Sequence, residues 1–240
     1  TMPVSVAEVI EREVQRYHDF SGRLVAVDRA EIRPRVSGTI DAVHFKEGES
    51  VKKGQLLFTI DQRPYQAELQ AAEARATLAD AELARSKALL AEKAVPQRDF
   101  DQRKNDAEVA KADLTRAKLD YDYTLIKAPI SGRVGRAEIT VGNLVDAGGN
   151  APVLTTIVSD KPIYADFDID EKLFLDYLKQ AGDDPARLNA IPAALGLAGE
   201  DGVPHEGRVQ SFDNELNTQS GTIRVRTVFP NENGVLVPGL

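Results

Sequence analysis

One stretch of this chain occurs twice, and this repeat limits the folds that the chain can adopt. Residues 36–54 (VSGTIDAVHFKEGESVKKG) align without a gap with residues 130–148 (ISGRVGRAEITVGNLVDAG), at a constant offset of 131 − 37 = 94. After a short insertion, LFTID (57–61) aligns with LTTIV (154–158). The repeated small residues are Ser37 with Ser131, Gly38 with Gly132, Gly48 with Gly142, and Gly54 with Gly148. Glycines that recur in register with alternating apolar residues mark turns and strand faces that are used twice. We therefore predict two halves of one β-sandwich, each covering the apolar face of the other, with the six glycines as structural turn residues.

The segment between the two halves, residues 64–122, carries a different pattern. Apolar or small residues recur every seven positions on two stretches that are separated by Pro96, which cannot lie inside an uninterrupted helix. The expected seam residues are Tyr65, Leu69, Ala72, Ala76, Ala79, Leu83, Ser86, Leu90, Phe100, Ala107, Ala110, Leu114, Ala117 and Tyr121. This pattern predicts an antiparallel α-helical coiled-coil hairpin with closely approaching helices. Thirty residues at 1.5 Å each give an arm of about 45 Å.

A second line of residues on the first helix has two interpretations. Ala74, Leu78, Ala81 and Ala88 could pack against a neighbouring arm, or they could be ordinary exposed residues of high helix propensity. The sequence leaves both open.

The flanking segments predict a second β-domain. PIYADFDID (162–170) alternates apolar and acidic residues, residues 171–180 form a short amphipathic pattern, and further strand patterns follow. We expect a mixed α+β, elongated multidomain fold. The residue patterns divide it into a β-barrel domain (13–28 and 161–240), a β-sandwich (29–63 and 123–160) and the α-helical hairpin (64–122).

Composition and motifs argue against several classes of function. With 38 acidic against 30 basic residues, nucleic acid is not an expected partner, and the lack of cysteine removes thiol chemistry. The spacing of three acidic residues, Asp166, Asp168 and Asp170, resembles that of a calcium-binding loop, but Glu171 stands where such a loop needs glycine. We therefore assign these three residues to the solvent-exposed face of a strand. The histidines, His18, His44 and His205, are scattered. We expect no catalytic site, no cofactor and no metal site.

The paired halves resemble the lipoyl/biotinyl carrier domain, which presents a modifiable lysine on a tight hairpin between them. In this chain that junction is Asp61-Gln62-Arg63-Pro64, and the helical segment replaces the hairpin. Asp160-Lys161 imitates the carrier motif but follows the second half. A carrier subunit is therefore the less favoured alternative.

The whole order of segments resembles the periplasmic adaptors, or membrane fusion proteins, of tripartite efflux pumps. The resemblance rests on RPRVSGTID with EGESVKKGQLLFTID, on YTLIKAPISGRVGRAEITVGNLV, and on SGTIRVRTVFPN followed by LVPGL. It is closest to adaptors of resistance-nodulation-division (RND) transporters, which implies an inner-membrane RND transporter and an outer-membrane TolC-like channel as partners. It also implies that the sandwich is a lipoyl-like domain (29–63 and 123–160) and that residues 1–12 are the N-terminal strand of an incomplete membrane-proximal domain. It further implies self-association, typically as a hexamer, and a periplasmic location with an anchor outside this chain. An adaptor of an ABC-type exporter or type I secretion system is the alternative.

The resemblance also implies a docking tip. The family carries Arg, then Leu four residues on, then Ser seven residues beyond. Arg85 and Leu89 match, whereas Pro96 stands in the place of the Ser. The resemblance thus implies an outer-membrane channel docking tip formed by Arg85, Leu89 and Pro96, in which Pro96 lacks the hydroxyl hydrogen bond.

Overall fold

The computed structural model describes residues 17–181 and 191–240, which fall into two compact units. The larger unit comprises Ala26–Ile163 and Pro230–Pro238. The smaller unit comprises the described residues up to Val25, those of Tyr164–Phe229, and Gly239–Leu240. The expected strand at residues 1–12 lies outside the described residues. Among the helices of the described ranges, none combines the length and the apolar character that crossing a bilayer requires.

The larger unit contains two four-stranded sheets, ordered β2-β9-β7-β4 and β6-β5-β3-β8. The strands of the first repeat and the strand before it are β2 (Arg29–Ile32), β3 (Gly38–Val43), β4 (Ser50–Val51) and β5 (Leu56–Ile60). Those of the second are β6 (Leu125–Lys127), β7 (Gly132–Val134), β8 (Leu144–Val145) and β9 (Thr155–Val158). When each strand is replaced by its counterpart in the other repeat, one sheet order becomes the other. The sandwich therefore has internal twofold pseudosymmetry.

The two repeats exchange strands, and the exchange keeps the offset of 94 residue by residue. Strand β4 pairs with β7 (Val51 opposite Gly132), while β8 pairs with β3 (Val145 opposite Gly38). The serines that align in the sequence make equivalent bonds, because the backbone N–H of Lys53 donates to Ser131 Oγ and that of Ala147 donates to Ser37 Oγ, both at 2.9 Å. The prediction of one sandwich built from two interlocked halves is confirmed.

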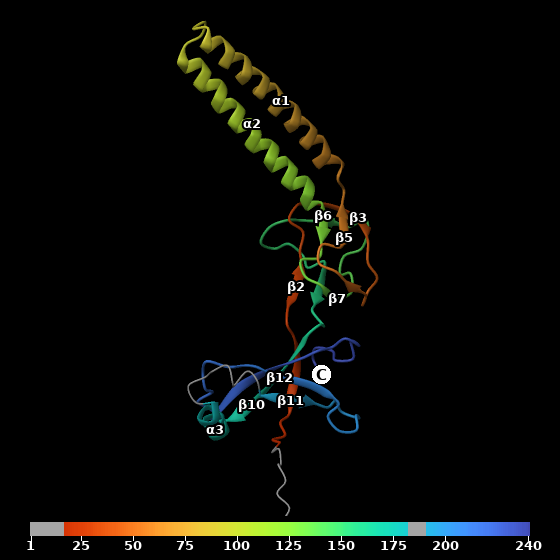
Figure 1. The fold of residues 1–240 in the computed structure, drawn as a ribbon. Coiled ribbons are helices and arrows are strands. Elements are labelled where there is room, and N and C mark those ends of the chain that lie inside the picture. The colour runs from red at the N-terminus through yellow and green to blue at the C-terminus, as the bar shows by residue number, and fades with distance from the viewer. Residues whose placement is uncertain (1–16, 182–190) are drawn as a thin grey trace, which may run out of the picture. The chain divides into compact units, whose positions relative to one another are not determined.

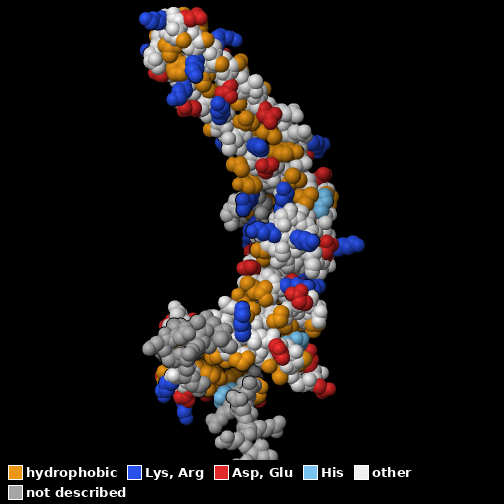
Figure 2. Space-filling model, in the orientation of Figure 1, with side chains coloured by type: hydrophobic (Ala, Val, Ile, Leu, Met, Phe, Trp, Pro, Cys, Tyr) orange, Lys and Arg blue, Asp and Glu red, His pale blue; other side chains and the backbone are white. Residues whose placement is uncertain are grey.

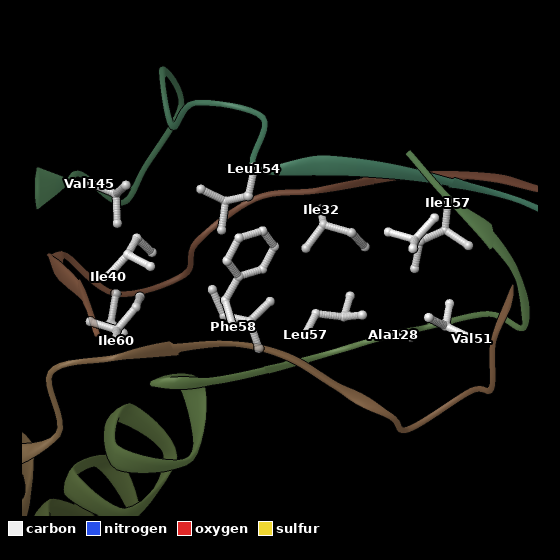
Figure 3. Packing of buried hydrophobic residues seen from close by; sticks show 13 residues of the cluster. Ile32, Ile40, Val51, Leu57, Phe58, Ile60, Ala128, Val145, Leu154 and Ile157 are labelled. Carbon is white, nitrogen blue, oxygen red and sulfur yellow. The ribbon is translucent and has the colours of Figure 1, made fainter. Parts of the chain in front are cut away.

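The core of the sandwich takes matching side chains from both repeats (Figure 3). The equivalent pairs Ile40 with Val134, Val51 with Val145, Leu57 with Leu154, and Ile60 with Ile157 are all at most 2% exposed. In Figure 3 the labelled side chains point from the two layers toward one another. Burial of these branched residues stabilises each layer against the other.

The hairpin consists of α1 (Arg63–Ala91) and α2 (Gln97–Tyr123), which lie side by side (Figure 1). Every predicted seam residue is buried or half-buried, and the fully buried ones are small: Ala72, Ala76, Ser86, Ala107 and Ala117. The second line, by contrast, is exposed throughout, with Leu78 at 62%. The 29 residues of α1 span about 44 Å. The predicted hairpin is confirmed.

Short polar contacts fix the base of the hairpin to the sandwich. Tyr65 Oη donates to the Ser37 carbonyl at 2.6 Å, and Gln62 Nε2 donates to Thr124 Oγ1 at 3.0 Å. At the start of α1, Arg63 donates twice to the Asp61 carboxylate through its side chain, and its backbone N–H donates to the same group. These hydrogen bonds lower the pKa of Asp61 to about 2. The hairpin is therefore attached to the sandwich at its base, both at the start of α1 and at the end of α2.

The smaller unit is a five-stranded sheet of order β1-β10-β13-β12-β11, with one helix. Its elements are β1 (Gly22–Ala26), β10 (Ile163–Asp170), α3 (Glu171–Ala181), β11 (Pro192–Leu195), β12 (His205–Phe212) and β13 (Thr222–Phe229). Ile169, Val209, Ile223 and Val225 form its core, against which Phe174 and Tyr177 of α3 pack. Residues 230–238, which the sequence placed with the barrel, are grouped by the structure with the larger unit.

The acidic triplet of β10 has a structural role within this sheet. Asp166 accepts two hydrogen bonds from Arg226 of β13, at 2.8 and 2.7 Å, and Asp168 lies 3.6 Å from Arg224. Ile169 is buried on the other face, as the alternation predicted. Asp166 and Asp168 are therefore engaged in cross-strand ion pairs.

Candidate functional site

The turn at the end of the hairpin has a well-defined geometry. Helix α1 ends at Ala91, and Lys93 adopts a left-handed conformation with φ of 58°. The N–H of Ala94 donates to the Leu89 carbonyl at 2.8 Å, and that of Lys93 donates to the Leu90 carbonyl at 2.9 Å. This pair of bonds is the Schellman motif, which usually has glycine at the left-handed position. A lysine there costs about 1 kcal/mol of backbone strain.

On the other side of the turn, Pro96 directly precedes α2. It is extended, with φ of −68° and ψ of 151°, and it provides no side-chain cap. Its carbonyl accepts the Asp99 N–H at 3.1 Å. Asp99 lies in the first turn of α2, where a carboxylate offsets the positive end of the helix dipole. A Ser at position 96 could have capped the helix, and Pro96 cannot.

The structure places all three predicted tip residues at the same end of the hairpin. Arg85 and Leu89 lie one turn apart on α1, near its end, and both side chains face solvent, Leu89 with 36% exposure. Pro96 is also exposed. On the visible face of the tip in Figure 2, hydrophobic side chains lie beside basic ones, with some acidic side chains among them. This combination suits a surface that binds another protein better than it suits catalysis.

Two further tip residues were not singled out from the sequence. Lys93 occupies the left-handed position of the turn, and Arg98 lies in the first turn of α2. The available signal was the absence of glycine between the two helical patterns, because a helix that ends in a Schellman motif without glycine places another residue in the left-handed conformation.

The six repeated glycines lie at equivalent positions in the two halves. Their φ angles are 155° and 158° for Gly38 and Gly132, 75° and 89° for Gly48 and Gly142, and 86° and 112° for Gly54 and Gly148. Only the first pair is also sterically restricted: a Cβ on Gly132 would collide with the Val158 backbone, and one on Gly38 would lie 2.6 Å from the Ile60 side chain. These positions therefore maintain the sandwich that carries the hairpin.

The positions that could suggest a cofactor or metal are engaged in structural contacts. Lys161 Nζ donates to the Glu232 carbonyl at 2.6 Å, and the peptide bond to Pro162 is cis. His44 Nε2 lies 2.8 Å from Thr59 Oγ1, and His205 Nε2 lies 3.2 Å from Glu200 Oε1. Within residues 17–181 and 191–240, no group of three potential ligands is arranged for a metal ion. The hairpin tip remains the strongest candidate site.

Comparisons with known proteins agree with this architecture. Residues 28–157 match the family model for the barrel-sandwich hybrid domain of RND MFPs, and residues 162–240 match that for the β-barrel domain of RND MFPs. The chain is 33% identical over its full length to multidrug resistance protein MexA of Pseudomonas aeruginosa, covering 63% of that protein. It is 32% identical over 99% of its length to multidrug efflux pump subunit AcrA of Escherichia coli K12, covering 64% of it.

A solved structure shares the fold. A MacA–MexA chimeric protein that contains the Pseudomonas aeruginosa MexA α-hairpin domain superposes with a TM-score of 0.74 at 23% identity, over 91% of this chain and 76% of the chimera. Both family models, the full-length relatives and the strand-exchanged sandwich interrupted by a hairpin lead to one conclusion: this chain belongs to the RND membrane fusion protein (MFP) family.

Proposed function

We propose that this chain belongs to a periplasmic adaptor that links an inner-membrane RND transporter to an outer-membrane TolC-like channel in multidrug efflux. The observation that carries the proposal is the similarity over the full chain to MexA and AcrA, both named as multidrug resistance or efflux proteins. The chain spans about 63% of the length of these relatives, so the remaining activities of a complete adaptor belong to the proposal as well.

The form of the larger unit supports an adaptor role. A helical hairpin of about 44 Å leaves the sandwich after β5 and returns to it at β6, with hydrogen bonds at its base. Such an arm holds its tip at a distance from the sandwich. We assign the tip to the contact with the channel, and the sandwich, the smaller unit and the exposed line of α1 to contacts with the transporter and with other adaptor copies in a hexamer.

At the tip, we propose that Leu89 inserts into an apolar groove of the channel and that Arg85 donates hydrogen bonds to carbonyls or a carboxylate beside it. Pro96 contributes no hydroxyl hydrogen bond, so Arg85 and Leu89 provide more of the binding energy. The proposed location is the periplasm, with the protein held at the inner membrane, and the proposal includes no catalytic step.

The test is drug efflux in cells that depend on the full-length protein. We expect Arg85→Asp and Leu89→Asp each to abolish resistance while the protein stays folded, abundant and associated with its transporter. The matched control is Leu119→Asp on α2, because Leu119 is exposed to a similar degree, 46%, away from the tip. Wild-type resistance in the Arg85→Asp, Leu89→Asp double variant would rule out this docking site.

The same cells separate the alternatives. Cross-linking followed by identification of the co-purified transporter distinguishes an RND partner from an ABC-type exporter. The intact mass of the purified protein detects a lipoyl or biotinyl group, which would identify a carrier subunit instead.

A further inference from the structure

We propose that the tip docks through a set of cations, Lys87, Lys93 and Arg98 beside Arg85, against a compact acidic patch on a protein surface. The inference rests on the proposed function, because it specifies the chemistry of the partner at the same tip. It follows from how charges are paired along the hairpin.

Most cations of the hairpin away from the tip have a carboxylate partner. The pairs are Arg63 with Asp61 (2.7 Å), Arg75 with Glu68 (2.6 Å), Arg103 with Glu82 (2.9 Å), Lys104 with Glu108 (3.9 Å) and Lys111 with Asp80 (2.7 Å). Within the described part of the chain, the side chains of Arg85, Lys87, Lys93 and Arg98 form no ion pair or hydrogen bond. Unpaired cations are therefore concentrated at the tip.

The tip also differs in net charge from the rest of the protein. Residues 85–98 contain four basic residues and one acidic residue, Glu92, in a chain whose formal net charge is −8. The acidic residues that follow have local roles: Asp99 lies in the first turn of α2, and Asp101 accepts a hydrogen bond from Gln97 at 2.9 Å. The tip is thus a local positive region on an acidic protein.

Lys93 gives an independent reason to assign a role to this charge. It has a left-handed backbone, and no other non-glycine residue of the described ranges has positive φ. Glycine would satisfy the same turn without strain, so the lysine places a cation at the turn between the helices at a conformational cost. Strained residues of this kind are concentrated at functional sites.

The surrounding residues favour a protein patch over a bilayer or nucleic acid. Leu89, 36% exposed beside Arg85, requires an apolar spot within the acidic patch. An extended anionic surface would also meet residues 63–84, which contain four acidic and two basic residues and would be repelled. An acidic patch about as wide as the tip is attracted by the tip cations without repulsion from the acidic residues of 63–84.

The experiment uses the full-length protein in cells with its transporter and channel. In the tip variant, Lys87→Glu, Lys93→Glu and Arg98→Glu are combined, and we expect at least roughly tenfold less efflux, as charge reversal weakens docking. The neutral variant, Lys87→Gln with Lys93→Asn and Arg98→Gln, should be intermediate, since Asn tolerates the left-handed conformation. The control is Arg116→Glu with Lys118→Glu, because both cations are exposed near the base of the hairpin and form no ion pair with any residue that the structure describes.

Suppressor selection then identifies the partner group. We expect mutations that restore efflux to the tip variant to replace Asp or Glu by neutral or basic residues in the outer-membrane channel. Efflux in the tip variant equal to that of the control would overturn the inference, as would suppressors confined to the adaptor or transporter. Tip-dependent flotation of the wild-type protein with phosphatidylglycerol vesicles would overturn it in favour of a membrane surface.

These outcomes are distinguishable from failure of the proposed function. If Leu89→Asp abolishes efflux but the tip variant does not, docking stands and the acidic partner is excluded. If the Arg85→Asp, Leu89→Asp double variant keeps efflux, docking itself fails.

Discussion

The β-sandwich and the hairpin belong to one unit, but different kinds of buried side chain stabilise each of them. The sandwich buries large branched and aromatic residues from both repeats, including Ile40, Phe58 and Leu154 at 0% exposure. The fully buried residues of the hairpin are all Ala or Ser. Stability in the sandwich therefore depends on a few large side chains, whereas stability in the hairpin is spread over many small contacts.

The largest effect in this comparison should come from the sandwich core. Phe58 is fully buried and contacts Phe45 edge-on, with ring centroids 5.3 Å apart. We expect Phe58→Ala to lower the free energy of unfolding by about 3–5 kcal/mol. The hairpin should lose protection from hydrogen exchange as well, since its base is attached to β5 and β6. The control is Leu144→Ala, at a site in the same sandwich that is 72% exposed. A denaturant titration measures the free energy of unfolding of both variants, and an equal loss in the two would contradict the expectation.

A smaller and more local effect is expected at the hairpin seam. Ala107 is 1% exposed, so Ala107→Leu would force the helices apart at a cost of about 1–3 kcal/mol. Hydrogen exchange should increase in α1 and α2 while the sandwich strands stay protected. Ala112→Leu, on the exposed side of α2, should leave exchange unchanged. Increased exchange of the sandwich strands in Ala107→Leu would show that the two regions do not differ as proposed.

The repeat also predicts a stabilising change. Thr155 is the counterpart of Phe58 and is fully buried, and its hydroxyl has no hydrogen-bond partner among the described residues. Thr155→Val keeps the shape and removes the unpaired polar group, so we expect a gain of about 1 kcal/mol in the free energy of unfolding. A loss of stability in thermal and urea unfolding would indicate that the hydroxyl is paired.

The smallest effect concerns the turn at the tip. Lys93→Gly should stabilise the hairpin by about 0.5 kcal/mol, because relief of left-handed strain exceeds the added entropy of the unfolded chain. Glu92→Gly, at a residue with φ of −83°, should have the opposite sign. Urea titration monitored by helical circular dichroism measures the stability of the two variants. Destabilisation by Lys93→Gly would exclude strain at this turn.

Much of the fold was predictable because two patterns of fixed spacing specify it. The offset of 94 matched strands, turn glycines and buried residues such as Ile40 and Val134, and the seven-residue spacing identified the seam. The exchange of β4 and β8 between the sheets was not predictable, because strands of two residues carry no pairing signal. The pairing of Asp166 with Arg226 joins residues 60 positions apart, for which the sequence offers no spacing rule.

The candidate site was predictable to a lesser degree. Helical spacing placed Arg85 and Leu89 on one face. The absence of glycine between the two helical patterns does not indicate which residue adopts the left-handed conformation, so Lys93 could not be identified from the sequence. The docking role of these residues stays a prediction.

The central claim is that the tip of the hairpin contacts the outer-membrane channel. We would place a photo-cross-linking amino acid at position 89, and in a separate variant at position 78, in the full-length protein in cells. Leu78 is 62% exposed against 36% for Leu89, so non-specific contact would favour position 78. We expect a cross-link to the outer-membrane channel from position 89 and a much weaker one, or none, from position 78. A channel cross-link that is stronger from position 78, or absent from both, would contradict the claim.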